Sequence, residues 1–150
     1  MRSLAFKIIK RLIIREYPSV AWITTKQLAI WLNNSTQPQP LLLDARSQPE
    51  YETSHLAQAQ RIDPYYPNLK IVDSKDTPIV VYCSVGYRSA RVATVLQQAG
   101  FSHVYNLEGS IFQWANEKRS LCKQDRPTTT VHPYNQLWGL LLNPRFRAVE

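Results

Sequence analysis

The nine residues YCSVGYRSA (82–90) bring together the groups that thiol chemistry needs. Cys83 is one of two cysteines and follows the apolar run PIVVY (78–82), which predicts a buried strand. Gly86 permits a tight loop, and Arg88 adds a positive charge where a helix is expected to begin. The free N–H groups at a helix N-terminus stabilise an anion by about 0.3–1 kcal/mol. The spacing therefore predicts a nucleophilic Cys83 thiolate, with a buried unreactive cysteine as the alternative.

The segments around this loop predict an α/β domain. LLLDA (41–45) and PIVVY (78–82) are continuous apolar runs, typical of strands that are buried on both faces, and HVYNLEG (103–109) gives a further strand. RSARVATVLQQAG (88–100) is the clearest helix pattern. Alternation of strands and helices favours a parallel sheet flanked by helices on both faces. Ligands of such sheets bind beyond the carboxyl ends of the strands, which is where we expect Cys83.

Both ends of the chain extend beyond this core. Residues 1–18 include apolar side chains at positions 4, 5, 8, 9, 12 and 13 with cations between them. This pattern predicts a basic amphipathic helix over residues 3–16, which packs on the domain or contacts an anionic membrane surface. Residues 119–150 show no sustained period and predict an extended tail. Because Trp138 and Leu140 are too apolar for a solvated tail, we expect this extension to dock on the domain or on a partner.

The composition indicates a globular chain. Its 150 residues are 44% hydrophobic and 19% charged, which fits a single domain, and we find no apolar run of the roughly 18 residues that a membrane-spanning helix needs. The apolar start of the chain is interrupted by Lys7, Lys10 and Arg11, whereas a secretory signal has an unbroken apolar block. We therefore expect a reducing, cytoplasmic location. The net charge of +7 favours an anionic substrate or partner. We expect no nucleic acid partner, since no nucleic-acid-binding module surrounds the basic residues.

The remaining histidines and cysteine indicate no metal site. His103 and His132 have no partner at metal-ligand spacing, and two distant cysteines make no zinc pattern. We therefore expect neither a metal nor another cofactor. Cys122 is either a resolving thiol for Cys83 or an ordinary cysteine, and its surroundings leave both interpretations open.

Several motifs within residues 19–118 together resemble the single-domain rhodanese family of sulfurtransferases. The matching pieces are Asp44-Ala45-Arg46 at a strand end, Glu50-Tyr51, His55-Leu56, the Cys83 loop, and Leu107-Glu108-Gly109 with Trp114. The resemblance implies a rhodanese-like parallel sheet and a carrier of sulfane sulfur. The Cys83 thiolate would take the outer sulfur of thiosulfate or another anionic donor, and pass it as a persulfide to a small thiophile or an acceptor protein.

The resemblance also assigns roles to neighbouring residues. The persulfide would lie in the loop formed by Ser84, Val85, Gly86, Tyr87 and Arg88. By its position, Arg88 would also steer the anionic oxygens of the donor. Asp44 and Arg46 would support the site as a local ion pair or hydrogen-bond network.

Two alternatives to sulfur transfer stay open. Four residues separate Cys83 from Arg88, whereas related phosphatases use five to hold a tetrahedral oxyanion, so the loop favours sulfur transfer over a phosphatase or arsenate reductase. The other alternative is a non-catalytic rhodanese-like interaction module.

The sequence also departs from the family. The family usually has Gly-His-Ile-Pro-Gly-Ala where this chain has Ser-His-Leu-Ala-Gln-Ala (54–59), and its second glycine after the glutamate is Ser110 here. We expect these differences to alter turn geometry rather than the sulfur chemistry.

Overall fold

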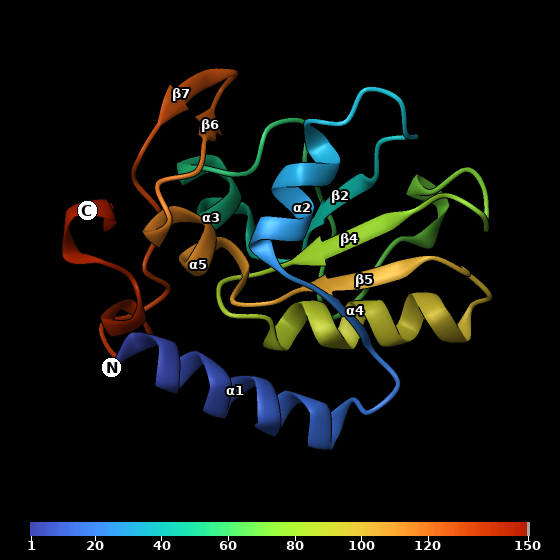
Figure 1. Cartoon of the computed structure of the whole chain (residues 1–150), viewed down its shortest axis with the longest axis horizontal. Coiled ribbons are helices and arrows are strands. Elements are labelled where there is room, and N and C mark those ends of the chain that lie inside the picture. The colour runs from blue at the N-terminus through green and yellow to red at the C-terminus, as the bar shows by residue number, and fades with distance from the viewer. Residues whose placement is uncertain (150) are drawn as a thin grey trace.

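A computed structural model describes residues 1–149 and has a five-stranded parallel sheet at its centre (Figure 1). The strands are β1 (Ala21–Ile23), β2 (Leu41–Asp44), β3 (Gln60–Arg61), β4 (Ile79–Tyr82) and β5 (Val104–Leu107). Their order across the sheet is β1-β5-β4-β2-β3, and each neighbouring pair is parallel. The predicted parallel α/β sheet is confirmed.

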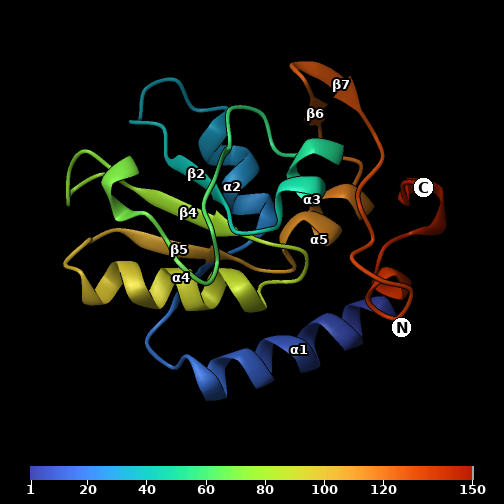
Figure 2. The ribbon, with the colours of Figure 1, turned by 180° about the vertical axis from the view of Figure 1, so that it is seen from behind.

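Helices cover both faces of this sheet, as predicted (Figure 2). They are α1 (Arg2–Glu16), α2 (Thr25–Leu32), α3 (Gln48–Thr53), α4 (Tyr87–Gln98) and α5 (Ser110–Asn116), with a short 3₁₀ helix η1 (Leu69–Ile71). Side chains from α2 and α5 fill the hydrophobic core on one face, and side chains from α4 and α1 fill the core on the other. No helix within residues 1–149 is long and apolar enough to cross a membrane.

The central strand β4 is buried on both faces. Ile79 and Val81 point into the core beneath α4, while Val80 and Tyr82 point into the core beneath α2 and α5. All four side chains are 0% exposed, which explains why the strand reads as an uninterrupted apolar run. The strand ends at the residue before Cys83, so the sheet itself fixes where the thiol stands.

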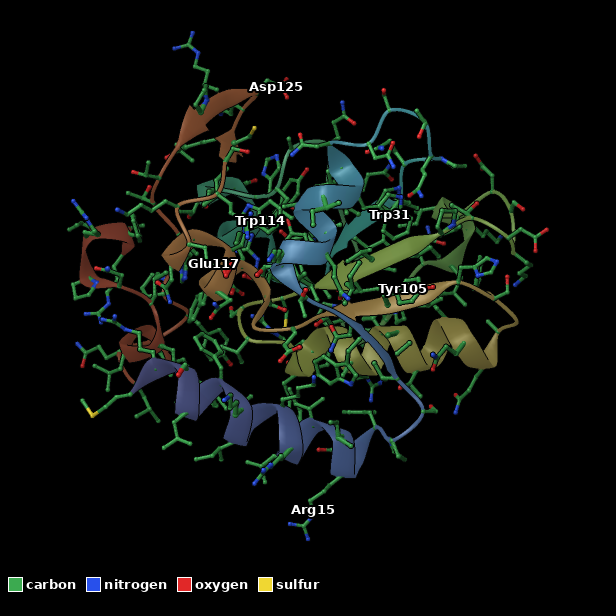
Figure 3. All side chains as sticks on the ribbon, in the orientation of Figure 1. Arg15, Trp31, Tyr105, Trp114, Glu117 and Asp125 are labelled. Atoms are coloured by element: carbon green, nitrogen blue, oxygen red, sulfur yellow. The ribbon has the colours of Figure 1, made fainter. Side chains whose placement is uncertain are left out.

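The N-terminal helix forms as predicted, but its apolar stripe does not pack as one face. Phe6, Ile9 and Ile13 contact the hydrophobic core. Leu4 and Ile8 belong to the same predicted stripe and are 62% and 50% exposed. Figure 3 shows Arg15 near the end of α1 pointing away from the domain. One side of α1 therefore covers the domain, and the other presents leucine, isoleucine and cations to solvent.

The C-terminal segment is more regular than the extended tail that the sequence predicted. Its elements are an antiparallel hairpin of β6 (Leu121–Lys123) and β7 (Arg126–Thr128), followed by the 3₁₀ helices η2 (Trp138–Leu141) and η3 (Pro144–Phe146). Asp125 lies at the hairpin tip (Figure 3). Val131, Leu142 and Phe146 join the core on the α2 and α5 face. Within this segment, η2 lies beside the start of α1, where Arg2 donates to the Leu140 carbonyl (Figures 1 and 2).

Candidate active site

The Cys83 thiol lies at the junction between β4 and α4. It is 1% exposed, and two hydrogen bonds reach its sulfur. The backbone N–H of Gly86 donates to Sγ at 3.1 Å, and the hydroxyl of Ser89 in the first turn of α4 donates at 3.4 Å. Both donors, together with the positive end of the helix dipole, favour a negatively charged sulfur at this point.

Gly86 gives the loop its shape. Its φ is +109°, a conformation that is costly for any residue with a Cβ, and this turn aims its N–H at the sulfur. Its carbonyl accepts a hydrogen bond from the buried Asn106 side chain of β5 at 2.9 Å. The neighbouring strand β5 thus fixes the loop backbone at Gly86.

The start of α5 holds the loop backbone from another direction. Cys83 N–H donates to the hydroxyl of Ser110 at 3.2 Å, and Ile111 N–H donates to the Cys83 carbonyl at 3.1 Å. Phe112 N–H in turn donates to the Ser84 carbonyl at 3.1 Å. The predicted catalytic residue is therefore anchored through its own peptide groups, and its side chain is left to face the pocket.

Glu50 of α3 holds the far end of the loop. Its carboxylate accepts two hydrogen bonds from the Arg88 guanidinium, at 2.8 and 2.9 Å, and one from Ser84 at 3.1 Å. Burial alone would raise the pKa of Glu50, but the hydrogen bonds and charge of Arg88, with the charge of Arg46, outweigh burial and lower this pKa to about 2. Glu50 is therefore ionised, and it neutralises Arg88.

The role that the sequence suggested for Arg88 differs from its position in the structure. We expected Arg88 to steer donor oxygens, yet its guanidinium is paired with Glu50, donates to Ser84 at 3.0 Å, and lies 4.9 Å from the ring of Tyr134. A bidentate carboxylate is a strong partner for arginine because the two planar groups match. Arg88 therefore stabilises the loop, and its positive charge is matched by the carboxylate of Glu50.

Asp44 and Arg46 form a second buried pair, at the end of β2. Arg46 donates to Asp44 at 2.7 and 2.9 Å, and both side chains are 0% exposed. Arg46 also donates to the Ser54 carbonyl at 2.6 Å, which ties β2 to the turn after α3. Burial alone would lower the pKa of Arg46, but the charge of Asp44 outweighs this and raises it. The pair supports the neighbouring loops and has no contact with the Cys83 sulfur among its hydrogen bonds.

A pocket of about 340 Å³ opens above the thiol. Its walls are Ile9, Leu12, Tyr65, Cys83, Ser84, Val85, Tyr87, Arg88, Tyr134 and Trp138. The predicted loop residues Ser84, Val85, Tyr87 and Arg88 thus line the pocket together with Cys83, whereas Gly86 does not. Cys122 is not part of the lining; it lies in β6, where its backbone pairs with His55. Within residues 1–149, no cluster of His, Cys, Asp and Glu could hold a metal ion.

Comparison with known proteins agrees with this geometry. The family model for the Rhodanese-like domain matches residues 26–117. Thiosulfate sulfurtransferase GlpE of Pseudomonas fluorescens (strain SBW25) is 35% identical over 79 residues, which are 49% of this chain and 69% of that protein. The chain belongs to the rhodanese family. Some members of this family are named as enzymes.

Two other similar proteins match different shares of this chain. The tRNA uridine(34) hydroxylase of Sodalis glossinidius is 36% identical over 89 residues, and this chain spans only 25% of its length. The crystal structure of the BH2092 protein from Bacillus halodurans covers 90% of this chain and 97% of its own, with a TM-score of 0.67 and 19% identity. That similarity supports the rhodanese fold.

Two positions at which this chain departs from its family have a positive φ. Gln58 and Ser110 occupy positions where the family usually has glycine, and their φ values are +65° and +48°. Both residues adopt the left-handed backbone conformation that glycine favours. Ser110 adds something that glycine lacks, because its hydroxyl accepts the Cys83 N–H.

The sequence did not indicate the roles of several residues at this site. Glu50 had a local signal, since Ser47 and Glu50 form a capping box at the start of α3, but that pattern indicates a helix start and not an ion pair with Arg88. The pocket walls Ile9, Leu12, Tyr134 and Trp138 lie outside the matched residues 26–117, so no family motif could indicate them.

Proposed function

We propose that this protein is a sulfurtransferase that carries sulfane sulfur as a persulfide on Cys83. The Cys83 thiolate attacks the outer sulfur of a donor such as thiosulfate, a new S–S bond forms, and the donor's own S–S bond breaks to release sulfite. The terminal sulfur of the persulfide then moves to a thiophilic acceptor such as cyanide, a thiol or a protein cysteine, which regenerates the thiolate.

One observation carries this proposal: a single sulfur atom, at the floor of a pocket, accepts hydrogen bonds from Gly86 N–H and the Ser89 hydroxyl. These donors suit a thiolate before the reaction and a persulfide after it. A separate general base is unnecessary if the thiol is already ionised. The named activity of the GlpE relative supports the same chemistry.

The persulfide can be tested by intact-protein mass spectrometry. Incubation with a panel of sulfane-sulfur donors should add the mass of one sulfur atom to the wild-type protein, and cyanide should remove it with release of thiocyanate. Cys83→Ser should acquire no sulfur, whereas Cys122→Ser should behave as wild type. Sulfur retained by Cys83→Ser, or lost in Cys122→Ser, would show that the nucleophile is misassigned.

The phosphatase-like alternative is less well supported. An enzyme of that type needs a free cation for the oxyanion, and Arg88 is paired with Glu50. Hydrolysis of an aryl phosphate that depends on Cys83, without persulfide formation from any donor, would favour that alternative. A protein that shows neither reaction would instead fit a non-catalytic interaction module.

A further inference from the structure

The pocket above Cys83 is walled mainly by apolar and aromatic side chains. Ile9 and Leu12 reach it from α1, and Tyr134 and Trp138 reach it from the C-terminal segment. Tyr65 completes the rim. A volume of about 340 Å³ is at the lower end of the range of about 300–1,000 Å³ that holds small organic ligands, and it greatly exceeds the space that one sulfur atom needs.

The charges at this pocket do not favour a small dianion. Arg88 is the only cationic side chain among the lining residues, and Glu50 neutralises it through a bidentate ion pair. The Tyr134 ring lies against the guanidinium. Tyr87, another lining residue, donates its hydroxyl to the carboxylate of Glu16 at the end of α1. The overall charge of +7 attracts anions from a distance, but an anion must lose water to enter, and the lining offers no unpaired cation in return.

Tyr87 also stays neutral at physiological pH. Its hydrogen bond to Glu16 raises the pKa of the Tyr87 hydroxyl to about 12, with smaller contributions from burial and from the charge of Glu16. The ring is therefore an aromatic wall with its polar end turned toward α1. The lining thus combines one nucleophile with aliphatic and aromatic surface.

From these observations we propose that the pocket selects organic sulfur donors with an apolar or aromatic body, and that thiosulfate is a poor donor. This inference rests on the proposed sulfurtransferase activity and specifies its substrate class. Suitable compounds are organic thiosulfonates and organic persulfides, whose terminal sulfur reaches Cys83 while the body lies against Leu12, Tyr134 and Trp138. α1 and the C-terminal segment would then determine specificity, and the family domain would supply the nucleophile.

A matched pair of donors tests this directly. Benzenethiosulfonate and methanethiosulfonate carry the same terminal sulfur and the same single charge. In both, the Cys83 thiolate takes that sulfur, the S–S bond breaks, and a sulfinate leaves with the bonding electrons. Rates of persulfide formation, each divided by the rate with a free thiol in solution, should favour the phenyl compound about tenfold or more, because only its ring fills the pocket. Thiosulfate should be slower than both.

Two exposed leucines of α1 provide a variant and its control. Leu12 lines the pocket and is 55% exposed, while Leu4 lies outside the lining and is 62% exposed, so neither substitution removes buried packing. Leu12→Lys should increase the thiosulfate rate about fivefold, the effect of one new partly exposed ion pair, and should reduce the phenyl preference. Leu4→Lys adds the same net charge and should change neither rate.

The outcomes distinguish this inference from the function beneath it. Persulfide on Cys83 with equal normalised rates for the two thiosulfonates, or with Leu12→Lys behaving as Leu4→Lys, would overturn the substrate class and leave sulfur transfer standing. No persulfide from any donor would overturn both. A strong phenyl preference that Trp138→Ala abolishes and Leu140→Ala preserves would further support the pocket, since Leu140 lies in the same 3₁₀ helix but outside the lining.

Discussion

The ion pair between Glu50 and Arg88 should be the main support of the Cys83 loop, and Glu50→Gln tests this. The substitution keeps the size of the side chain but removes its charge. Arg88 would then hold a largely buried positive charge with no carboxylate partner, since its side chain is 17% exposed. Breaking such a pair from one side is costly because the remaining charge stays desolvated.

The magnitude follows from the pKa of Glu50. Burial opposes ionisation, but Arg88 outweighs it and lowers the pKa from 4.5 to about 2, and each unit corresponds to 1.36 kcal/mol. The folded state is therefore stabilised by about 3 kcal/mol at neutral pH. Because the pKa is lowered in the folded protein, this contribution is complete above about pH 4.5 and is lost as the pH falls toward 2.

Urea denaturation and thermal melting across this pH range provide the assay. At pH 7, Glu50→Gln should unfold with about 3 kcal/mol less free energy, which for a chain of this size lowers the Tm by roughly 6–12 °C. The difference from wild type should shrink as the pH approaches 2. Glu52→Gln, on the exposed side of α3, is the control and should match wild type. Equal stability of the two variants at pH 7 would refute the proposed role of the ion pair.

Three further predictions concern backbone strain and the second buried pair. Gly86→Ala and Gly100→Ala both place a Cβ at positive φ, +109° and +94°, and each should cost about 1 kcal/mol of stability in denaturation. Only Gly86→Ala should also slow persulfide formation, because a shift of the backbone at residue 86 moves the N–H that contacts the sulfur. Equal rates of persulfide formation in the two variants would contradict this role of the Gly86 N–H. Gln58→Gly should raise the stability by up to about 1 kcal/mol, because it relieves a φ of +65°, and Gln58→Ala should show no such gain. Asp44→Asn should destabilise the protein by about 3 kcal/mol or more in urea unfolding, because it leaves the buried Arg46 without its anionic partner. A loss of less than about 1 kcal/mol would show that Arg46 finds another partner.

The parallel core was predictable because each of its elements carries a local signal. Strand β4 is buried on both faces, so its run of apolar residues needs no knowledge of its neighbours. Helix α4 combines a clear period with a stop at Gly100. Once strands and helices alternate, the rules of parallel sheets place the residue after β4 at the ligand-binding edge. The position of Cys83 follows from these steps alone.

The ends of the chain were harder to predict for two physical reasons. In α1, apolar residues follow one another in pairs, such as Ile8 and Ile9, and periodicity does not determine which member of a pair packs on the domain. In the structure Ile9 packs on the core, whereas Ile8 is 50% exposed. Strands β6 and β7 have three residues each, and β7 contains Pro127, which weakens any strand signal. Their pairing depends on a turn with positive φ at Gln124 and Asp125.

The role of Arg88 shows what a spacing motif leaves undetermined. A cysteine and an arginine with four residues between them indicate an anion-binding loop, but the net charge of that loop depends on Glu50, 38 positions before Arg88. Once Glu50 neutralises Arg88, the loop keeps its backbone donors and the helix dipole and loses its free cation. These remaining groups stabilise a sulfur anion that is attached to the protein, whereas they provide little binding energy for a free dianion. The same loop can therefore favour a persulfide on Cys83 and still disfavour thiosulfate as its source, and the selection of donors falls to the apolar walls that α1 and the C-terminal segment add.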